Sequence, residues 1–186
     1  MPNEEELLKN ARSFDQDTLG LIYDEYSPGI YRYAMRLLGD SQLAEDCVAD
    51  TFSRFLKALQ FGQGPKEHLK AYLYRISHNW ITDSYRRHPF ISVDLDDSLA
   101  LDESQNVDEV VDSGLEQQRV RMALQALTPE QRQVVILRFL EGWNNEQIAE
   151  VLEKPIGAVK ALQHRALNAL RRLLLRDEKE SDDGTR

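Results

Sequence analysis

This 186-residue sequence has only one cysteine, so it cannot form a disulfide within the chain. It has no long apolar run and no charged-then-apolar N-terminal signal, which predicts neither membrane insertion nor secretion. These features fit a protein of a reducing, cytoplasmic compartment. No His/Cys metal cluster, glycine-rich phosphate loop or pair of catalytic carboxylates stands out, so the sequence predicts no enzyme, no metal and no cofactor.

An excess of positive charge is also lacking, since the net charge is −9, which looks wrong for a nucleic-acid-binding protein. The acidity is local, however. Residues 88–114 contain eight Asp and Glu and no Lys or Arg. Residues 61–87 carry five Lys and Arg against two acidic residues, and residues 142–176 carry six against three. Two basic blocks therefore flank one acidic block. The acidic composition of the middle block is typical of a flexible linker between two domains.

The stretch from Leu127 to Leu174 predicts helices joined by tight turns. Thr128 followed by Pro129 is a typical helix start, and Gly142 is a typical helix end. Asn144 is a candidate N-cap for a short helix. The turn Glu153-Lys154-Pro155 leads into a last helix. Its expected inward residues are Val159, Leu162, Ala166 and Leu170, whereas Val134, Val135, Leu137, Phe139 and Leu140 are the expected apolar side of the first helix.

The pattern indicates a helix-turn-helix, which places the N-terminal side chains of its last helix in the major groove of DNA. Lys or Arg pairs there with guanine and Gln with adenine. The residues left on or beside the polar face are Lys160, Gln163, His164 and Arg165. The alternative is an ordinary amphipathic helical hairpin with a proline turn.

Three further helices are expected ahead of the acidic segment, at 17–38, 41–60 and 66–87. Pro28-Gly29 interrupts the first, which predicts a kinked helix or two helices in line. In the second we expect Leu43, Cys47, Val48, Phe52, Phe55, Leu56 and Leu59 to face inward. Residues 1–16 predict a short helix that is loosely attached to the main body.

The helix over 66–87 interleaves aromatic residues with Arg, Lys and Asn, which suits unpaired nucleic-acid bases because rings and guanidinium planes stack on them. The alternative is that Trp80 is a plain core residue among solvated arginines. The sequence thus predicts an all-α fold with two small helical domains joined by the acidic linker, the second a helix-turn-helix. The expected boundaries are 1–16, 17–87, 88–114, 115–176 and a disordered tail over 177–186.

The segments AEDCVADTFSRFLKAL and AYLYRISHNWITDSYRR, followed by a linker and LTPEQRQVVILRF with a helix-turn-helix, resemble the extracytoplasmic-function (group 4) sigma factors of bacterial RNA polymerase. The resemblance covers about 17–87 and 115–174. It implies a sigma factor that binds core RNA polymerase, recognises the −10 and −35 promoter elements and opens DNA. It implies core RNA polymerase, promoter DNA and an anti-sigma factor as partners.

The resemblance also implies roles for individual residues. Those expected to contact polymerase are Asp46, Asp50, Thr51 and Arg54. Those expected to contact the −10 element, beside an unpaired base held by the loop 61–67, are Lys70, Tyr74, Arg75, Asn79, Trp80, Asp83, Arg86 and Arg87. Those expected to contact the −35 element are Gly157, Ala158, Lys160, Gln163, His164 and Arg165.

The last helix departs from the family pattern G-T-V-K-S-R-L-H-R-A, because it reads Gly157-Ala158-Val159-Lys160-Ala161-Leu162-Gln163-His164-Arg165-Ala166. The Ser-Arg pair is replaced at positions 161 and 162. Two other readings stay open. A stand-alone helix-turn-helix regulator with an N-terminal dimerisation or sensing domain would bind promoters without polymerase, and an adaptor protein would not need the basic aromatic helix.

Overall fold

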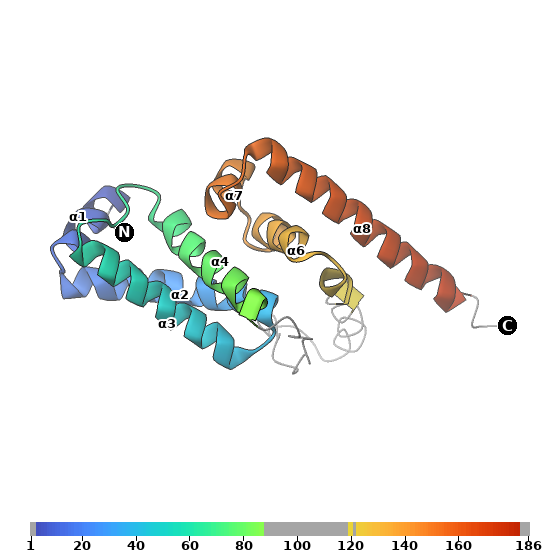
Figure 1. Ribbon diagram of the computed structural model, residues 1–186, viewed down its shortest axis with the longest axis horizontal. Helices are drawn as coiled ribbons and strands as arrows, with labels where there is room; N and C mark the ends of the chain where they lie inside the picture. The colour runs from blue at the N-terminus through green and yellow to red at the C-terminus, as the bar shows by residue number, and fades with distance from the viewer. Residues whose placement is uncertain (1–2, 88–118, 121, 183–186) are drawn as a thin grey trace, which may run out of the picture. The chain divides into compact units, whose positions relative to one another are not determined.

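The structure is a computed structural model of the chain that describes residues 3–87, 119–120 and 122–182. All regular secondary structure within these ranges is helical, which confirms the expected all-α fold (Figure 1). The first helices are α1 (Glu4–Arg12), α2 (Gln16–Leu38), α3 (Ser41–Gln60) and α4 (Leu69–Arg87). The later ones are α6 (Pro129–Val135), the π-helical turn η1 (Ile136–Leu140), α7 (Asn145–Leu152) and α8 (Ile156–Asp182). The predicted linker over 88–114 lies outside the described residues.

The chain forms two compact units, one built on α1 to α4 and the other on α6, η1 and α8. Polar caps set the helix boundaries of the first unit, as Gly39-Asp40-Ser41 shows. Gly39 adopts the left-handed conformation (φ 66°) and ends α2, and its N–H donates to the carbonyl of Met35 at 2.8 Å. The carboxylate of Asp40 accepts the N–H of Leu43 at 2.8 Å and begins α3. The sequence predicts this junction because each residue type satisfies backbone groups that a helix end leaves unpaired.

Helix α2 runs without a break through Pro28, so the expected alternative of two separate helices is wrong. A proline inside a helix removes its own N–H donor and its ring crowds the carbonyl four residues earlier, at a cost of about 3 kcal/mol or more that packing must offset. Pro28 is exposed, and residues on both sides of it pack into the core, including Ile22 and Ile30. Burial of these side chains against α3 and α4 favours one continuous helix.

Helix α1 is docked on the first unit, so the expectation of a loosely attached N-terminal helix is wrong. Leu8 and Ala11 are buried, and α1 packs against both α2 and α3. The sequence contains these apolar positions, but two of them on a short helix that begins with three glutamates do not predict a packed helix. In Figure 1, α1 lies at one end of the group formed by α2, α3 and α4.

The predicted inward face of α3 is confirmed except at its edges, where Leu56 is exposed and Leu43 is half-buried. Cys47, Val48, Phe52, Phe55 and Leu59 of α3 are buried. Leu56 is 38% exposed because it lies at the border of the apolar stripe, which on a helix spans about 100°. Tyr23 of α2 is also exposed, with its ring centroid 4.7 Å from that of Phe52.

Helix α2 contacts the Tyr74 side chain of α4 at Gly29. A Cβ atom at this position would lie 2.7 Å from the hydroxyl oxygen of Tyr74. The Tyr74 side chain has little room to move, because it is buried and its ring centroid is 5.4 Å from that of Tyr33. Glycine is therefore needed at this crossing for its size.

Gly29→Ala should destabilise the chain by about 1–3 kcal/mol through overpacking, which exceeds the gain of up to about 1 kcal/mol from helix propensity. The matched control is Gly20→Ala in the same helix, where nothing lies within 4 Å of the added Cβ. That change should stabilise the chain. Urea unfolding of both variants measures the difference, and the same sign for both would contradict the role assigned to the crossing.

Two sets of side-chain-to-backbone hydrogen bonds fix the start of α6 in the second unit. The Thr128 hydroxyl accepts the N–H of Gln131, and the Gln131 side chain accepts the N–H of Thr128, which confirms the predicted helix start. The guanidinium of Arg132 donates to the carbonyls of Leu124 and Gln125, both at 2.8 Å. Arg132 thereby ties α6 to the end of the helical residues 122–125.

The end of the first helix of this unit differs from the expectation. Residues Ile136 to Leu140 form a π-helical turn, and Phe139 and Leu140 are about half exposed rather than inward-facing. The wider turn changes the periodicity, which the 3.6-residue spacing used for the prediction does not include. Gly142 follows in the left-handed conformation (φ 71°), as predicted.

Helix α8 extends to Asp182, so the predicted disordered tail is wrong for residues 177–182. Residues 183–186 lie outside the described residues. The polar composition of DEKESD misled the prediction, because Glu and Lys are also good helix formers and the segment continues an existing helix. The core between α6 and α8 contains Leu127, Val135 and Ala166.

Candidate nucleic-acid and protein interfaces

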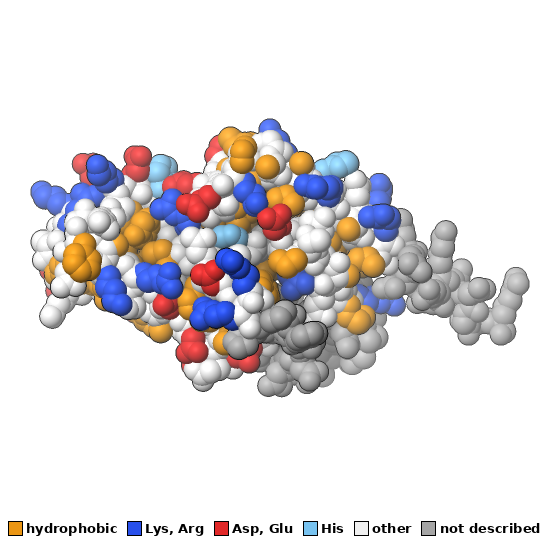
Figure 2. All heavy atoms as spheres, in the orientation of Figure 1, with side chains coloured by type: hydrophobic (Ala, Val, Ile, Leu, Met, Phe, Trp, Pro, Cys, Tyr) orange, Lys and Arg blue, Asp and Glu red, His pale blue; other side chains and the backbone are white. Residues whose placement is uncertain are grey.

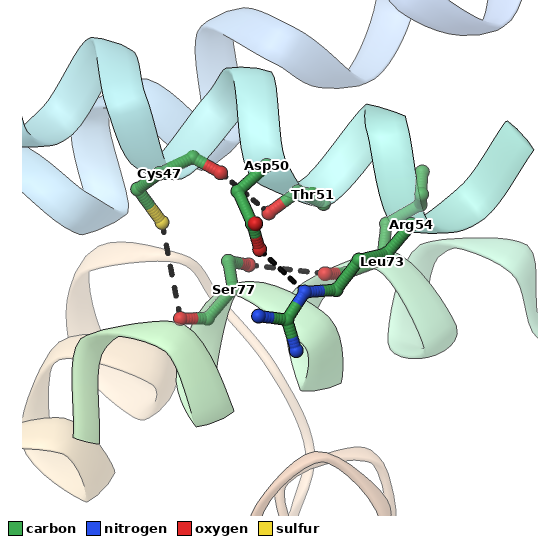
Figure 3. Close-up of polar contacts among 6 residues, drawn as sticks. All are labelled: Cys47, Asp50, Thr51, Arg54, Leu73 and Ser77. Carbon is green, nitrogen blue, oxygen red and sulfur yellow. Dashed lines mark hydrogen bonds and ion pairs between the residues drawn. The ribbon is translucent and has the colours of Figure 1, made fainter. Parts of the chain in front are cut away.

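The exposed side of α3 carries the charged residues predicted to contact polymerase. Asp46, Asp50 and Arg54 follow one another at intervals of four residues, so they share one side of the helix. Asp50 and Arg54 form an ion pair at 2.6 Å, with their side chains 33% and 52% exposed (Figure 3). Asp46 is exposed and accepts a long hydrogen bond from Gln42 at 3.4 Å. We call Asp46, Asp50 and Arg54 the α3 charged stripe.

Thr51 does not belong to this stripe, which corrects the expectation that it contacts polymerase. Its side chain is fully buried, and its hydroxyl donates to the carbonyl of Cys47 at 2.7 Å (Figure 3). A helical position directly after Asp50 is rotated by about 100° from it, which here is enough to turn Thr51 into the core. The buried hydroxyl of Thr51 is satisfied within α3, so it is not available to a partner.

Cys47 is a core residue at the contact between α3 and α4, as predicted. Its sulfur lies 3.8 Å from the carbonyl oxygen of Ser77, whose hydroxyl donates to the carbonyl of Leu73 at 3.0 Å (Figure 3). Burial raises the pKa of the Cys47 thiol to about 12. The thiol therefore stays protonated at neutral pH, which fits a packing role and not a nucleophile or metal ligand.

A groove lies between α2 and α3, next to the α3 charged stripe. Its wall includes Tyr23, Tyr31 and Arg32 from α2 and Glu45 from α3. Aromatic and charged side chains in a groove suit contact with another protein, since each offers both apolar area and hydrogen bonds. The groove extends the candidate protein interface from α3 onto α2.

Helix α4 displays most of the residues predicted to contact the −10 element. Lys70, Asn79, Asp83, Arg86 and Arg87 are exposed, and Arg75 and Trp80 are half-buried. The positions of these seven side chains are compatible with contact to a nucleic-acid strand. Asp83 is the acidic residue among these seven, and its carboxylate lies 3.7 Å from the guanidinium of Arg86.

Tyr74 must be removed from this set, because it is only 2% exposed. Its ring packs against Tyr33, and its hydroxyl fills the space over Gly29. A buried ring cannot stack on a base unless the helices separate. The half-buried Tyr72 is more accessible, and its ring centroid lies 5.5 Å from the guanidinium carbon of Arg75, a predicted DNA residue.

The loop between α3 and α4 precedes this helix. Phe61 is 73% exposed, and Gly62 (φ 68°) and His68 (φ 56°) both take the left-handed conformation. Two side chains of α1 contact the last part of the connection. The guanidinium of Arg12 donates to the carbonyl of Pro65 at 2.9 Å, and the carboxylate of Glu4 accepts the N–H of Leu69.

The sequence pattern does not predict a role for Glu4 and Arg12, because residues 1–16 contain no recognisable motif. One signal was available. The two residues are eight positions apart, or about two helical turns, so they share one side of any helix that contains both. The long-range contact itself, across more than fifty residues of chain, is set by the tertiary structure.

The helix-turn-helix is present as expected in α7, the turn at Glu153 to Pro155, and α8. Asn144 caps α7 by accepting the N–H of Gln147 at 2.8 Å, and the Gln147 side chain accepts the N–H of Asn144 at 3.0 Å. Glu153 takes the left-handed conformation (φ 52°) in the turn. The guanidinium of Arg138 holds the preceding turn by donating to the carbonyl of Trp143 at 2.8 Å.

The first turns of α8 present the predicted polar residues. Gly157, Lys160, His164 and Arg165 are exposed, and Ala158 and Gln163 are half-buried. The amide of Gln163 donates to the side-chain oxygen of Asn145 at 2.7 Å, so it ties α8 to α7. Val159, Leu162 and Ala166 are buried as predicted. Leu162 thus faces the core, whereas Ala161 is exposed.

Helix α8 also carries charge of one sign over most of its length. Residues 156–174 contain Lys160, Arg165, Arg171 and Arg172 and no Asp or Glu. Figure 2 shows blue side chains spread along this helix. A long basic helix whose first turns are exposed fits the phosphate backbone and groove of duplex DNA.

Comparison with known proteins finds a family match for each of the two groups of helices. Family models described as "Sigma-70 region 2" and "Sigma-70, region 4" match residues 22–89 and 117–170. The chain is 33% identical to the ECF RNA polymerase sigma factor BldN of Streptomyces coelicolor over 91% of its own length and 65% of that protein. It is 31% identical to the ECF sigma factor SigL of Mycobacterium tuberculosis over 88% of its length and 93% of the relative.

Solved structures agree with these relatives. The chain is similar to CnrH in complex with the cytosolic domain of CnrY, with a TM-score of 0.70, 26% identity and coverage of 94% of this chain and 98% of that one. It is also similar to the sigma factor RpoE of Bartonella quintana in complex with the anti-sigma factor NepR. That match has a TM-score of 0.61 and 26% identity, and covers 88% of this chain and 97% of that one.

Proposed function

The chain belongs to the sigma-70 family as an extracytoplasmic-function sigma factor, and from this premise we propose which of its surfaces carries out each step of promoter-specific initiation. The proposed domains are 17–87 for polymerase binding and −10 recognition, 88–114 as a linker, and 115–176 for −35 recognition. The alternative of a stand-alone regulator is not favoured, because the matched models and relatives are all those of sigma factors. None of the described helices is long and apolar enough to cross a bilayer.

The α3 charged stripe is proposed to dock on core RNA polymerase, together with the groove between α2 and α3. The side chains of Asp50 and Arg54 are 33% and 52% exposed, and the ion pair between them fixes the orientation of both groups. Oriented charges at a protein surface contribute mainly to partner choice and association rate. The proposal therefore gives this surface the task of selecting polymerase.

Helix α4 and the preceding loop are proposed to bind the separated −10 strand. One observation supports this proposal. Helix α4 exposes Lys70, Asn79, Arg86 and Arg87, and the loop before it exposes the aromatic ring of Phe61. Cationic groups bind phosphates, and exposed rings and guanidinium planes stack on unpaired bases. The capture of unpaired bases would favour the open form of the duplex.

Helix α8 is proposed to read the −35 element in duplex DNA. Lys160 and Arg165 are the exposed cations in its first turns, and His164 lies beside them. Gln163 is already bonded to Asn145, so we assign it chiefly to positioning α8 on α7. Positions 161 and 162 are proposed to make no hydrogen bonds to bases, because alanine has no polar side-chain atom and Leu162 is buried.

The proposal as a whole is tested by run-off transcription with core polymerase, with and without this protein, on genomic fragments. Specific transcripts are expected only when both are present, since the chain itself is proposed to be non-enzymatic and to act in the cytoplasm with polymerase. Promoter binding by the chain alone at equal affinity would instead support the stand-alone regulator. Because its structural neighbours CnrH and RpoE are seen with CnrY and with an anti-sigma factor, we also propose an inhibitory protein partner.

Lys160→Ala should weaken binding of the chain, in complex with core polymerase, to a duplex that carries the −35 element. If Lys160 contacts only phosphate, the loss should be similar for all sequences and the slope of log K against log salt should fall by roughly one. A base contact would instead cost about 1–3 kcal/mol and relax one position.

The matched control for Lys160→Ala is Arg172→Ala, which removes the same charge from an exposed position three turns farther along α8. It should change affinity less and leave sequence preference intact. Lys160→Ala and Arg165→Ala combined should weaken binding further. Unchanged affinity of the double variant would mean that the first turns of α8 do not face DNA.

A further inference from the structure

Helix α1 holds the connection between α3 and α4 through two side chains. The guanidinium of Arg12 donates to the carbonyl of Pro65 at 2.9 Å, and the carboxylate of Glu4 accepts the N–H of Leu69, the first residue of α4. The two contacts span residues 53 and 65 positions apart in sequence. They come from opposite ends of the same short helix, so α1 bridges the last part of the loop and the start of α4.

The Glu4 contact satisfies a backbone group that α4 leaves unpaired at its start. The first N–H groups of a helix have no partner within it, and a carboxylate at this end also meets the positive pole of the helix. The first part of the loop is anchored on α3, since the N–H of Gln63 donates to the carbonyl of Ala58 at 2.8 Å. The last part, which includes the left-handed His68, is anchored on α1.

Helix α1 is itself fixed, so it can serve as an anchor. Leu8 and Ala11 are buried against α2 and α3. The pKa of Tyr26 in α2 is raised by burial and, to a lesser degree, by the negative charges of Glu4 and Glu25, which places the Glu4 carboxylate near α2 as well. A shift of the loop end would have to break both polar contacts or undock the helix.

We propose that α1 holds the loop 61–68 and the first turn of α4 in the conformation that receives the separated −10 strand, so that Glu4 and Arg12 are positioning residues for promoter opening. This inference rests on the proposed function of that loop and of α4. It gives the N-terminal helix, which has no DNA-binding surface assigned to it, a part in strand separation. Neither residue needs to touch DNA for this role.

The test uses Arg12→Met, which keeps an unbranched apolar stem but loses the donors, and Glu4→Ala, which loses the acceptor. With core polymerase, both should lower open-complex formation on a duplex promoter by about fivefold to tenfold, the scale set by the loss of one intramolecular hydrogen bond. Affinity for core polymerase and for a −35 duplex should stay the same. Glu4→Gln, which keeps an acceptor oxygen, should retain most of the activity.

Hydrogen exchange on the free chain supplies a readout that does not depend on transcription. Arg12→Met and Glu4→Ala should raise exchange in peptides that cover 64–70 and leave the middle of α3 unchanged. The control is Lys9→Met, which removes a charge from an exposed position of α1 and should change neither exchange in the loop nor opening. Unchanged exchange in 64–70 in both contact variants would overturn the proposed anchoring.

A variant in the loop itself separates this inference from the proposed function. Phe61→Ala combined with Gln63→Ala should lower opening if the loop receives the −10 strand. If this loop variant opens duplex promoters normally, the proposed −10 site is wrong and the inference falls with it. If the loop variant fails to open DNA while Arg12→Met and Glu4→Ala open it normally, the −10 site stands and the positioning role of α1 is overturned.

Discussion

Asp46→Arg is expected to abolish stable binding of the chain to core RNA polymerase while leaving the fold intact. Asp46 is exposed on α3, and its one described bond is a 3.4 Å contact from Gln42. Surface substitutions of this kind usually change the free energy of unfolding by no more than about 0.5 kcal/mol. A reversed charge facing a complementary partner costs several kcal/mol, which corresponds to a loss of affinity of roughly a hundredfold or more.

The matched control is Asp17→Arg, the same charge reversal at an exposed position in the first turn of α2, outside both the α3 charged stripe and the residues that line the groove. It should bind polymerase nearly as well as the unchanged chain. Asp50→Arg should also lose binding, but it removes the ion pair with Arg54 from a half-buried site, so its loss is harder to interpret. Affinity is measured by titrating labelled chain with core enzyme. Normal affinity of Asp46→Arg would show that polymerase docks elsewhere.

Local polar signals in the sequence predicted the helix boundaries well. The predicted caps at Thr128 and Asn144 and the predicted helix end at Gly142 are all present. Each of these signals acts within four residues, so the sequence contains both partners side by side. The order of helices and the helix-turn-helix follow from them.

The side on which a single residue lies was harder to predict. Thr51 and Tyr74 belong to sequence segments that match the family, yet both are buried. A motif indicates which helix forms a surface, whereas the rotation of the helix in its bundle decides which of its residues reach that surface. Tyr74 turns inward because Gly29, 45 residues away in the chain, leaves room for its hydroxyl. No local pattern contains this information.

The same distinction explains the N-terminal helix. A short helix was predicted within residues 1–16, but its polar contacts are with Pro65 and Leu69. The π-helical turn at Ile136 to Leu140 is a comparable case, because it breaks the periodicity from which the inward face was predicted. In both cases the missing information lies in contacts or geometry beyond one helical repeat.

Asn79→Ala combined with Arg86→Ala should lower open-complex formation on a duplex promoter by roughly thirtyfold or more, because contacts to unpaired bases contribute about 1–3 kcal/mol each and two of them are lost. Both side chains are exposed on α4. Arg86 lies 3.7 Å from Asp83 in an exposed pair that contributes little to stability, so the fold should tolerate its loss. Fluorescence of a base analogue in the −10 region measures opening.

The decisive comparison for this variant is between a duplex promoter and the same promoter with a pre-opened bubble. If α4 captures bases as the strands separate, the defect should be much smaller on the bubble, where the cost of opening has been removed. Tyr74→Phe is the matched control, since it alters a buried position of the same helix and should open both templates normally. Equal defects on duplex and bubble would mean that Asn79 and Arg86 contribute to binding DNA in either form and that strand separation depends on other residues.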